Sequence, residues 1–121
     1  MAHFSARQLK NFMGFWPPFL GAGVKIKEFA DDGTRIVVTH KPNLLTKNAM
    51  GVAFGGTMSA MTDPFFMLAS MHRLGKEYRI WDTAGEITFV KPGRGRITAD
   101  MRIPEETYAL IKEKTANGDK Y

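Results

Sequence analysis

Apolar and polar positions divide the chain into short amphipathic segments on either side of one long apolar run. In the first segment, Leu9, Phe12 and Met13 recur at spacings of three and four residues. This spacing predicts a helix over residues 5–14, with Ser5 as a suitable N-terminal cap. The W-P-P that follows is expected to end the helix, because proline lacks a backbone N–H group and restricts the residue before it.

Two segments with strand patterns come next. Val24 and Ile26 alternate with lysines in residues 24–29, and residues 35–41 are rich in β-branched side chains. The D-D-G between them is typical of a hairpin turn, so we expect an antiparallel pair. His40 stands near the end of the second strand, with no other ligand at metal-binding spacing, and is expected to be a surface or edge residue.

The longest apolar run carries a single charged residue. From residue 54 or 55 to residue 75 the pattern is helical and apolar on almost all sides, as in a helix buried by its surroundings. Asp63 is the one charged residue in it before Arg73, and an unpaired carboxylate in such surroundings costs free energy. Alternatively, Asp63 caps a shorter helix that has Pro64 at its first position, where proline is favoured.

The remaining patterns predict two more strands and a helix. Residues 78–91 are long enough for one bent strand, in which Gly85 marks a bulge. After a P-G-R-G turn, residues 96–103 alternate, with Ile97, Ala99, Met101 and Ile103 on the inward side. Residues 105–114 read as a helix.

This element order predicts an α+β fold in which an antiparallel sheet wraps around one long central helix. Four strands cannot cover a helix that is apolar on all sides, so a partner subunit is expected. The domain is a single one, because 121 residues is near the common domain size.

Composition narrows the functional classes. The net charge is +5, but no basic run occurs, which favours a solvated surface; a polyanionic ligand is the functional alternative. No nucleic-acid-binding module and no membrane span is expected, and no metal site. There is no cysteine, and the N-terminus lacks the basic and apolar segments of a signal peptide, so a cytoplasmic location is expected.

Three motifs give the chain a recognisable family resemblance. They are F-W-P-P-F-L-G-A-G-V from residue 15, N-x-x-G-x-x-F-G-G from Asn48 with Asp63 after it, and V-K-P-G-R-G from residue 90. With them, the chain resembles the hotdog-fold acyl-CoA thioesterases, in particular the small DUF4442 group and, more distantly, the PaaI type. Where the PaaI-type pattern has His, this chain has Phe54.

The resemblance implies a hotdog domain over residues 1–121, shortened at its C-terminus because relatives generally continue through further strands. It implies homodimers, or dimers of dimers (homotetramers), with the sheets joined edge to edge. It also implies hydrolysis of an acyl-CoA thioester, with no cofactor beyond the coenzyme A part of the substrate. The site is expected between two subunits, beside the N-terminus of the central helix.

The reaction assigns roles to the central motif. The amide groups of Gly55 or Gly56 would bind the thioester oxygen, since the first turn of a helix has free N–H donors; alternatively, the two glycines only allow close packing. Asn48 would orient the substrate, or is a turn residue. Asp63 would be general base or nucleophile, with a pKa raised by burial. It lies about 12 Å along a helix from Gly55, so it would serve the other subunit's site.

Further residues are candidates for substrate binding. Lys91, Arg94 and Arg96 would bind the phosphates of coenzyme A, with Arg73 and Lys76 as alternatives; any of these residues could instead be ordinary surface charges. Met58 would contact the acyl group, and Phe54 and Thr62 are further candidates for substrate binding. A non-catalytic acyl-CoA-binding protein is the second hypothesis, and the Phe54 position favours it.

Overall fold

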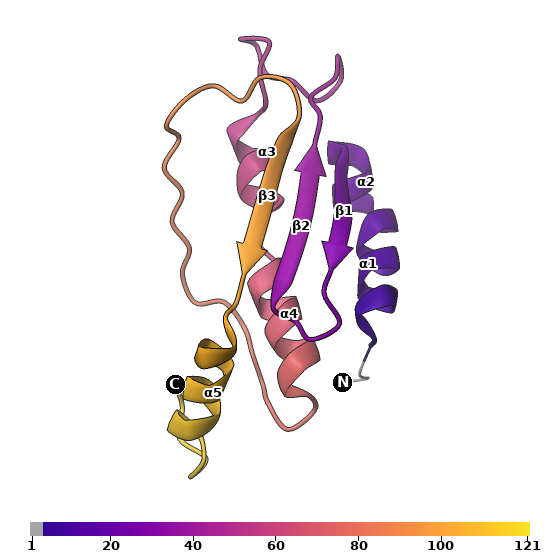
Figure 1. The fold of residues 1–121 in the computed structure, drawn as a ribbon. Coiled ribbons are helices and arrows are strands. Elements are labelled where there is room, and N and C mark those ends of the chain that lie inside the picture. The colour runs from indigo at the N-terminus through magenta and orange to yellow at the C-terminus, as the bar shows by residue number, and fades with distance from the viewer. Residues whose placement is uncertain (1–3) are drawn as a thin grey trace.

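Three strands and five helices make up the computed structural model, which describes residues 4–121. Residues 1–3 lie outside the described residues. They are the start of the N-terminal segment that was predicted to lack a signal peptide. The strands β1 (Val24–Phe29), β2 (Arg35–His40) and β3 (Ile97–Arg102) form one antiparallel sheet in the order β1-β2-β3 (Figure 1). The helices are α1 (Ala6–Phe15), α2 (Pro17–Ala22), α3 (Gly55–Ala60), α4 (Phe65–Leu74) and α5 (Glu105–Lys114). The expected α+β class is confirmed.

The N-terminal helix is capped and stopped as its sequence predicts. Ser5 and Gln8 form a capping box: the Ser5 hydroxyl accepts the Gln8 N–H at 3.1 Å, and the Gln8 side chain accepts the Ser5 N–H at 2.9 Å. The helix ends before Trp16, but Pro17 then starts α2, which the sequence reading missed. Proline favours the first turn of a helix because no intrahelical partner is needed there.

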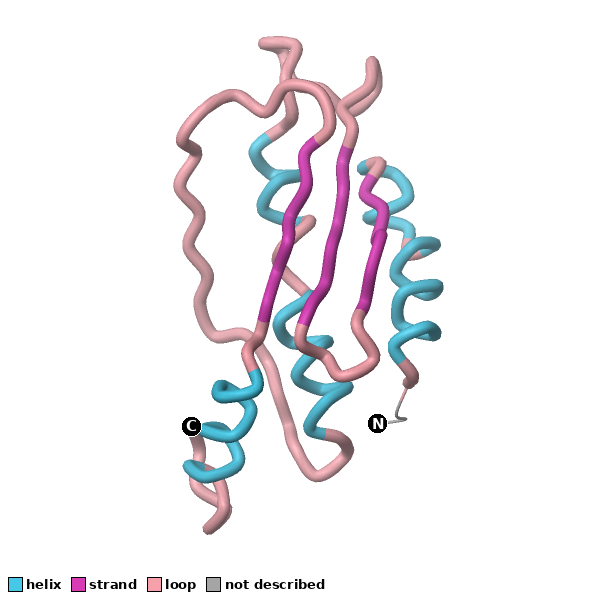
Figure 2. Tube along the Cα trace, viewed as in Figure 1, coloured by secondary structure: helices cyan, strands magenta, loops and turns pink. Residues whose placement is uncertain are grey.

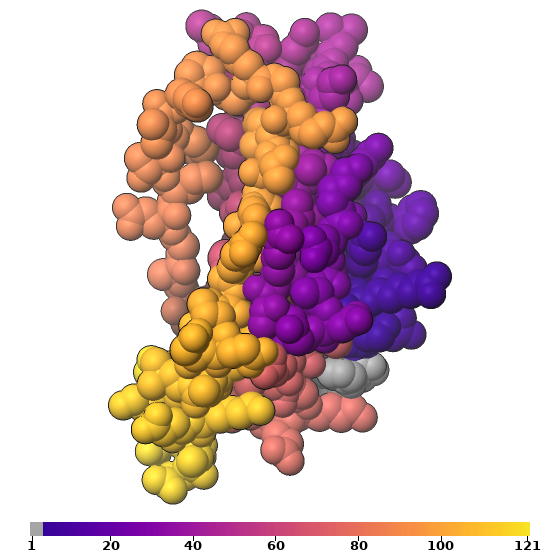
Figure 3. Space-filling view, viewed as in Figure 1, coloured from indigo at the N-terminus to yellow at the C-terminus, as the bar shows by residue number. Residues whose placement is uncertain are grey.

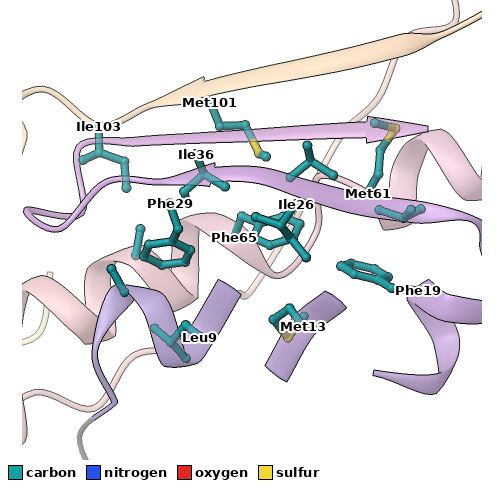
Figure 4. Close-up of a cluster of buried hydrophobic side chains, with 14 of the residues drawn as sticks. Leu9, Met13, Phe19, Ile26, Phe29, Ile36, Met61, Phe65, Met101 and Ile103 are labelled. Carbon is teal, nitrogen blue, oxygen red and sulfur yellow. The ribbon is translucent and has the colours of Figure 1, made fainter. Parts of the chain in front are cut away.

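One face of the sheet carries the hydrophobic core. In the β2–β3 pairing, Ile36 lies opposite Met101 and Val38 lies opposite Ala99, so the predicted inward set of β3 is confirmed. Leu9 and Met13 of α1 and Phe65 of α4 pack against this face (Figure 4). A bulge between Ile26 and Glu28 breaks the alternation of β1 and returns Phe29 to the core.

His40 also lies on the core face, and the expectation of a surface residue is wrong. Residues 36, 38 and 40 point to the same side of β2 because side chains alternate with period two. The side chain is 1% exposed, and its Nδ1 is 3.1 Å from the carbonyl oxygen of Gly23. Within residues 4–121, its Nε2 is buried without a hydrogen-bond partner.

The prediction of a single long central helix is also wrong, because the apolar run forms α3 and α4 with a turn between them. Hydrogen bonds of helical spacing continue into the turn, with the Asp63 N–H donating to Ser59 at 3.1 Å. Pro64 has no N–H to extend the series, and α4 begins after it. The alternative in which Asp63 caps the second helix is wrong too, because no side chain caps α4.

Residues 78–91 do not form the predicted strand. They run as an extended loop beside β3 (Figure 2), and an opening separates this loop from β3 in the space-filling view (Figure 3). Within residues 4–121, no backbone hydrogen bond involves residues 79–92. The sheet therefore has three strands rather than four, and the outer edge of β3 is unpaired.

Charged side chains cover the other face of the sheet. Arg35 donates two hydrogen bonds of 3.1 Å to the Asp100 carboxylate, and Arg102 also donates to it at 3.1 Å. The hydrogen bonds from Arg35, and then those from Arg102, lower the pKa of Asp100 to about 2. These contacts hold β2 and β3 in register across the exposed face.

The C-terminal helix is anchored by Tyr108, which is buried although its neighbours in α5 are exposed. Its hydroxyl donates to the carbonyl oxygen of Gly33 at 2.5 Å, and the Arg73 guanidinium lies 4.9 Å from its ring centroid. Arg73 also forms a two-pronged salt bridge with Glu105. This hydrogen bonding raises the pKa of Arg73 and lowers that of Glu105.

Candidate functional site

The loop before α3 is shaped by Asn48. Its Oδ1 accepts hydrogen bonds from the backbone N–H groups of Met50 at 2.9 Å and Val52 at 3.3 Å. Its own backbone N–H donates to the Val52 carbonyl oxygen at 2.8 Å. Asn48 thus acts as a turn residue in this chain, the second of its two expected roles, because asparagine mimics a backbone turn with its side chain.

Two glycines open α3, and aromatic rings cover both. A Cβ atom on Gly55 would lie 3.0 Å from the ring of Phe89, and one on Gly56 would collide with the ring of Phe54. The carbonyl oxygen of Phe54 accepts the N–H groups of Thr57 and Met58, at 3.0 and 3.2 Å. The N–H groups of Gly55 and Gly56 come before these and have no partner within the helix. The glycines therefore provide both close packing and free donors.

A basic hollow lies next to this helix start. It has a volume of about 590 Å³ and is lined by Met58, Lys91, Arg94 and Arg96, together with residues 92, 93 and 97. The turn that carries the cations is fixed to the loop before α3, because the Ala53 N–H donates to the Gly93 carbonyl oxygen at 3.0 Å. A Cβ on Gly93 would lie 2.6 Å from the end of the Ile97 side chain and 3.1 Å from the Ala53 Cβ, so a larger residue would require both neighbours to shift.

The cations of the basic hollow are available to a ligand. Lys91, Arg94 and Arg96 are exposed, and none of them forms an ion pair within residues 4–121. The structure thus brings together four of the residues expected to bind substrate. Of the two alternative cations, Arg73 is already paired with Glu105, and Lys76 lines a different cavity.

Asp63 is outside this group. It is exposed in the single chain, so the expected burial of its carboxylate is wrong there. Neighbouring Thr62 directs its hydroxyl to the Ser59 carbonyl oxygen at 3.0 Å. Within the described residues, no hydrogen bond or salt bridge joins Asp63 to Gly55 or Asn48, and Asp63 does not line the basic hollow.

Sequence reasoning missed Phe89 as a neighbour of Gly55, because the two residues are 34 positions apart and no local pattern links them. It also missed a larger apolar cavity beside α4, described below. In the described part of the chain, no three His, Asp or Glu side chains are grouped as metal ligands. None of the helices described is long and apolar enough to cross a membrane.

Comparisons with known proteins agree on the fold. The sequence profile of the family described as "Domain of unknown function (DUF4442)" matches residues 5–119. The chain is similar to the crystal structure of a protein of unknown function from Chlorobaculum tepidum TLS. The TM-score is 0.69 at 21% identity, over 98% of this chain and 76% of the other.

A second solved structure with the same fold is thioesterase HI1161 from Haemophilus influenzae. The TM-score is 0.65 at 20% identity, over 82% of this chain and 68% of that one. No curated protein matches the chain. At these identities the likeness establishes the fold alone, an α+β domain that this chain shares with both structures.

Proposed function

The chain belongs to the DUF4442 family, and from that premise we propose that it binds an acyl-CoA thioester beside the start of α3 and hydrolyses it. The observation that carries this proposal is the basic hollow, which is lined by Met58 in the first turn of α3, the helix that Gly55 and Gly56 begin. Coenzyme A is a polyanion attached to an apolar acyl group. Unpaired lysine and arginine side chains next to Met58 suit both parts of such a ligand.

In the proposed reaction, the thioester oxygen accepts hydrogen bonds from the N–H groups of Gly55 and Gly56. These donors stabilise the negative charge that develops on the oxygen as the carbonyl carbon is attacked. Water attacks that carbon and gives a proton to the base. The C–S bond then breaks, the base returns the proton to the leaving thiolate to give the coenzyme A thiol, and the acyl group leaves as the carboxylic acid. Asn48 positions the loop that holds the donors.

The base in this proposal is Asp63 of a second copy of the chain. Asp63 lies in the turn after α3, eight positions after Gly55, and hydrogen bonds of helical spacing continue into that turn. At the helical rise per residue this is a separation of about 12 Å, too far for both residues to reach one thioester within one chain. Exposure leaves the Asp63 carboxylate, with Thr62 beside it, available to another subunit. We therefore propose a homodimer, alone or paired into a tetramer, with the site at the interface. A cytoplasmic location is part of the same proposal.

The second candidate is an acyl-CoA-binding protein without turnover. Phe54 favours it, because a phenyl ring cannot hydrogen-bond a thioester or a water molecule. The same ring is 55% exposed and covers Gly56, so it could contact an acyl group while the glycines bind its carbonyl.

The decisive experiment measures two quantities on one panel of acyl-CoA substrates: release of the coenzyme A thiol, and binding by calorimetry. Hydrolysis that Asp63→Asn abolishes, and that Asp82→Asn leaves unchanged, supports the thioesterase; Asp82 is an exposed aspartate on the loop 78–91. Saturable binding without release identifies the binding protein. Absence of both would refute the proposed site.

A further inference from the structure

A second cavity lies at the other end of the helix pair from the basic hollow. It has a volume of about 710 Å³ and lies between α1, α4 and residues 75–81. In Figure 1, α3 begins at one end of the molecule and α4 ends at the other. This is a size typical of small-molecule sites.

The wall of this cavity is almost entirely apolar. Leu9 and Met13 line it from α1, and Met67 and Met71 line it from α4. Unbranched methionine side chains adapt to a flexible apolar ligand at little cost in conformational strain. Trp81 and Phe12, which are 63% and 65% exposed, also line it and leave it open to solvent.

Two cations give the cavity positive charge, and the Tyr78 hydroxyl and the Trp81 indole N–H are also polar groups on its lining residues. Lys76 and Arg79 line it and are exposed, and neither forms an ion pair within residues 4–121. No aspartate or glutamate lines it. His72 is in the wall, but its ring nitrogens lie 3.0 Å and 2.6 Å from the backbone carbonyl oxygens of Phe4 and Asp31.

We propose that this cavity binds a single-chain amphiphile with an anionic head, of the long-chain carboxylate class. The alkyl chain lies along the methionines and Leu9, and the carboxylate pairs with Lys76 and Arg79. Charge supports this class, because the two exposed cations attract an anionic head, repel a cationic one and gain nothing from a neutral one. The site does not depend on hydrolysis at Gly55.

The test uses dodecanoate and dodecyltrimethylammonium below their micelle concentrations and dodecanol below its solubility limit, with the fluorescence of Trp81 in a Trp16→Phe background as the readout. Dodecanoate is expected to bind at least tenfold more tightly than the other two. Shortening the chain to ten carbons weakens binding, by at most about fourfold for each methylene removed. The double variant Lys76→Glu, Arg79→Glu is expected to lose the preference for dodecanoate.

The matched control is Lys25→Glu, Lys27→Glu, which makes the same charge change on exposed positions of β1 and is expected to keep the preference. Equal binding of the three amphiphiles, or a preference unaffected by the Lys76 and Arg79 changes, overturns the proposal. The proposal is also overturned if dodecanoate does not bind and the protein is a dimer that the Lys76 and Arg79 changes dissociate. In that case a second copy of the chain would cover the cavity. Circular dichroism confirms folding of each variant.

Discussion

The hydroxyl group of Tyr108 donates a hydrogen bond to the carbonyl oxygen of Gly33, which ties the C-terminal helix to the turn between β1 and β2. Only glycine suits this turn position, because its φ is +72° and a Cβ would lie 2.9 Å from the Ala69 carbonyl oxygen. One hydrogen bond therefore links two segments that are far apart in the sequence, at a turn that lies close to a third, α4.

Tyr108→Phe is expected to reduce the free energy of unfolding by about 1–2 kcal/mol, because the buried Gly33 carbonyl oxygen loses its donor while the ring packing remains. Urea denaturation followed by circular dichroism measures the change. Tyr121→Phe, at an exposed position, is the control and should leave the midpoint unchanged. An unchanged midpoint in Tyr108→Phe would show that water replaces the bond.

Phe54→His restores the residue of the PaaI-type pattern at the start of α3. If the site hydrolyses thioesters, the imidazole should raise turnover by about tenfold or more, since a positioned acid or base typically contributes more than that. Phe54→Leu, which keeps an apolar side chain, is the matched control. Steady-state assays on one acyl-CoA separate kcat from KM; a gain in binding alone would argue against catalysis at this position.

Removing cations from the basic hollow should weaken coenzyme A binding. Arg94→Ala and Arg96→Ala are each expected to raise the Kd of an acyl-CoA about fivefold, with a smaller dependence of Kd on salt. Lys120→Ala, far along the chain at an exposed position, serves as control. Calorimetry at two salt concentrations is the measurement, and equal losses in all three variants would mean that only net charge matters.

The stability of the sheet should depend on pH through Asp100. Its pKa is about 2 in the folded chain, below its ordinary value of 3.8, because Arg35 and Arg102 hydrogen-bond the carboxylate. The carboxylate thus stabilises the fold at pH values above about 4, and this contribution is lost as the pH falls toward 2.

Asp100→Asn should therefore destabilise the protein at pH 6 and make less difference at pH 2.5. Urea midpoints of the two proteins at both pH values give the comparison. Asp119→Asn, near the exposed C-terminus, should show no such difference between the two pH values. If the urea midpoints of Asp100→Asn and the parent differ by the same amount at both pH values, the arginine contacts do not persist in solution.

Local signals in the sequence predicted much of the fold. The capped helix α1, the β1–β2 hairpin and α5 depend on spacings, caps and turn residues within about ten positions. The strand over residues 78–91 failed because a strand needs a hydrogen-bonded neighbour, and the open edge of β3 does not reach it. His40 was misplaced because its burial depends on which face of β2 meets the helices.

The candidate site, like the fold, could be predicted from the sequence only in part. The cations near Gly93 could be predicted to lie with α3 from a family motif, but their position depends on the contact between Gly93 and Ala53. The role of Asp63 could not be predicted from a motif. Helical spacing places its carboxylate far from Gly55 of the same chain, so any contact with a substrate there depends on how a second chain packs.

Proteolytic cleavage in the extended loop 78–91 would divide the chain into two fragments that remain associated. Its aromatic residues Trp81 and Phe89 are exposed, and the backbone around them has no hydrogen bonds to hold it against a protease. Cleavage there leaves β3 paired along its whole length with β2, from Arg35 opposite Arg102 to His40 opposite Ile97. The C-terminal fragment would then be a removable strand and helix, and mixing it with the N-terminal fragment would rebuild the sheet.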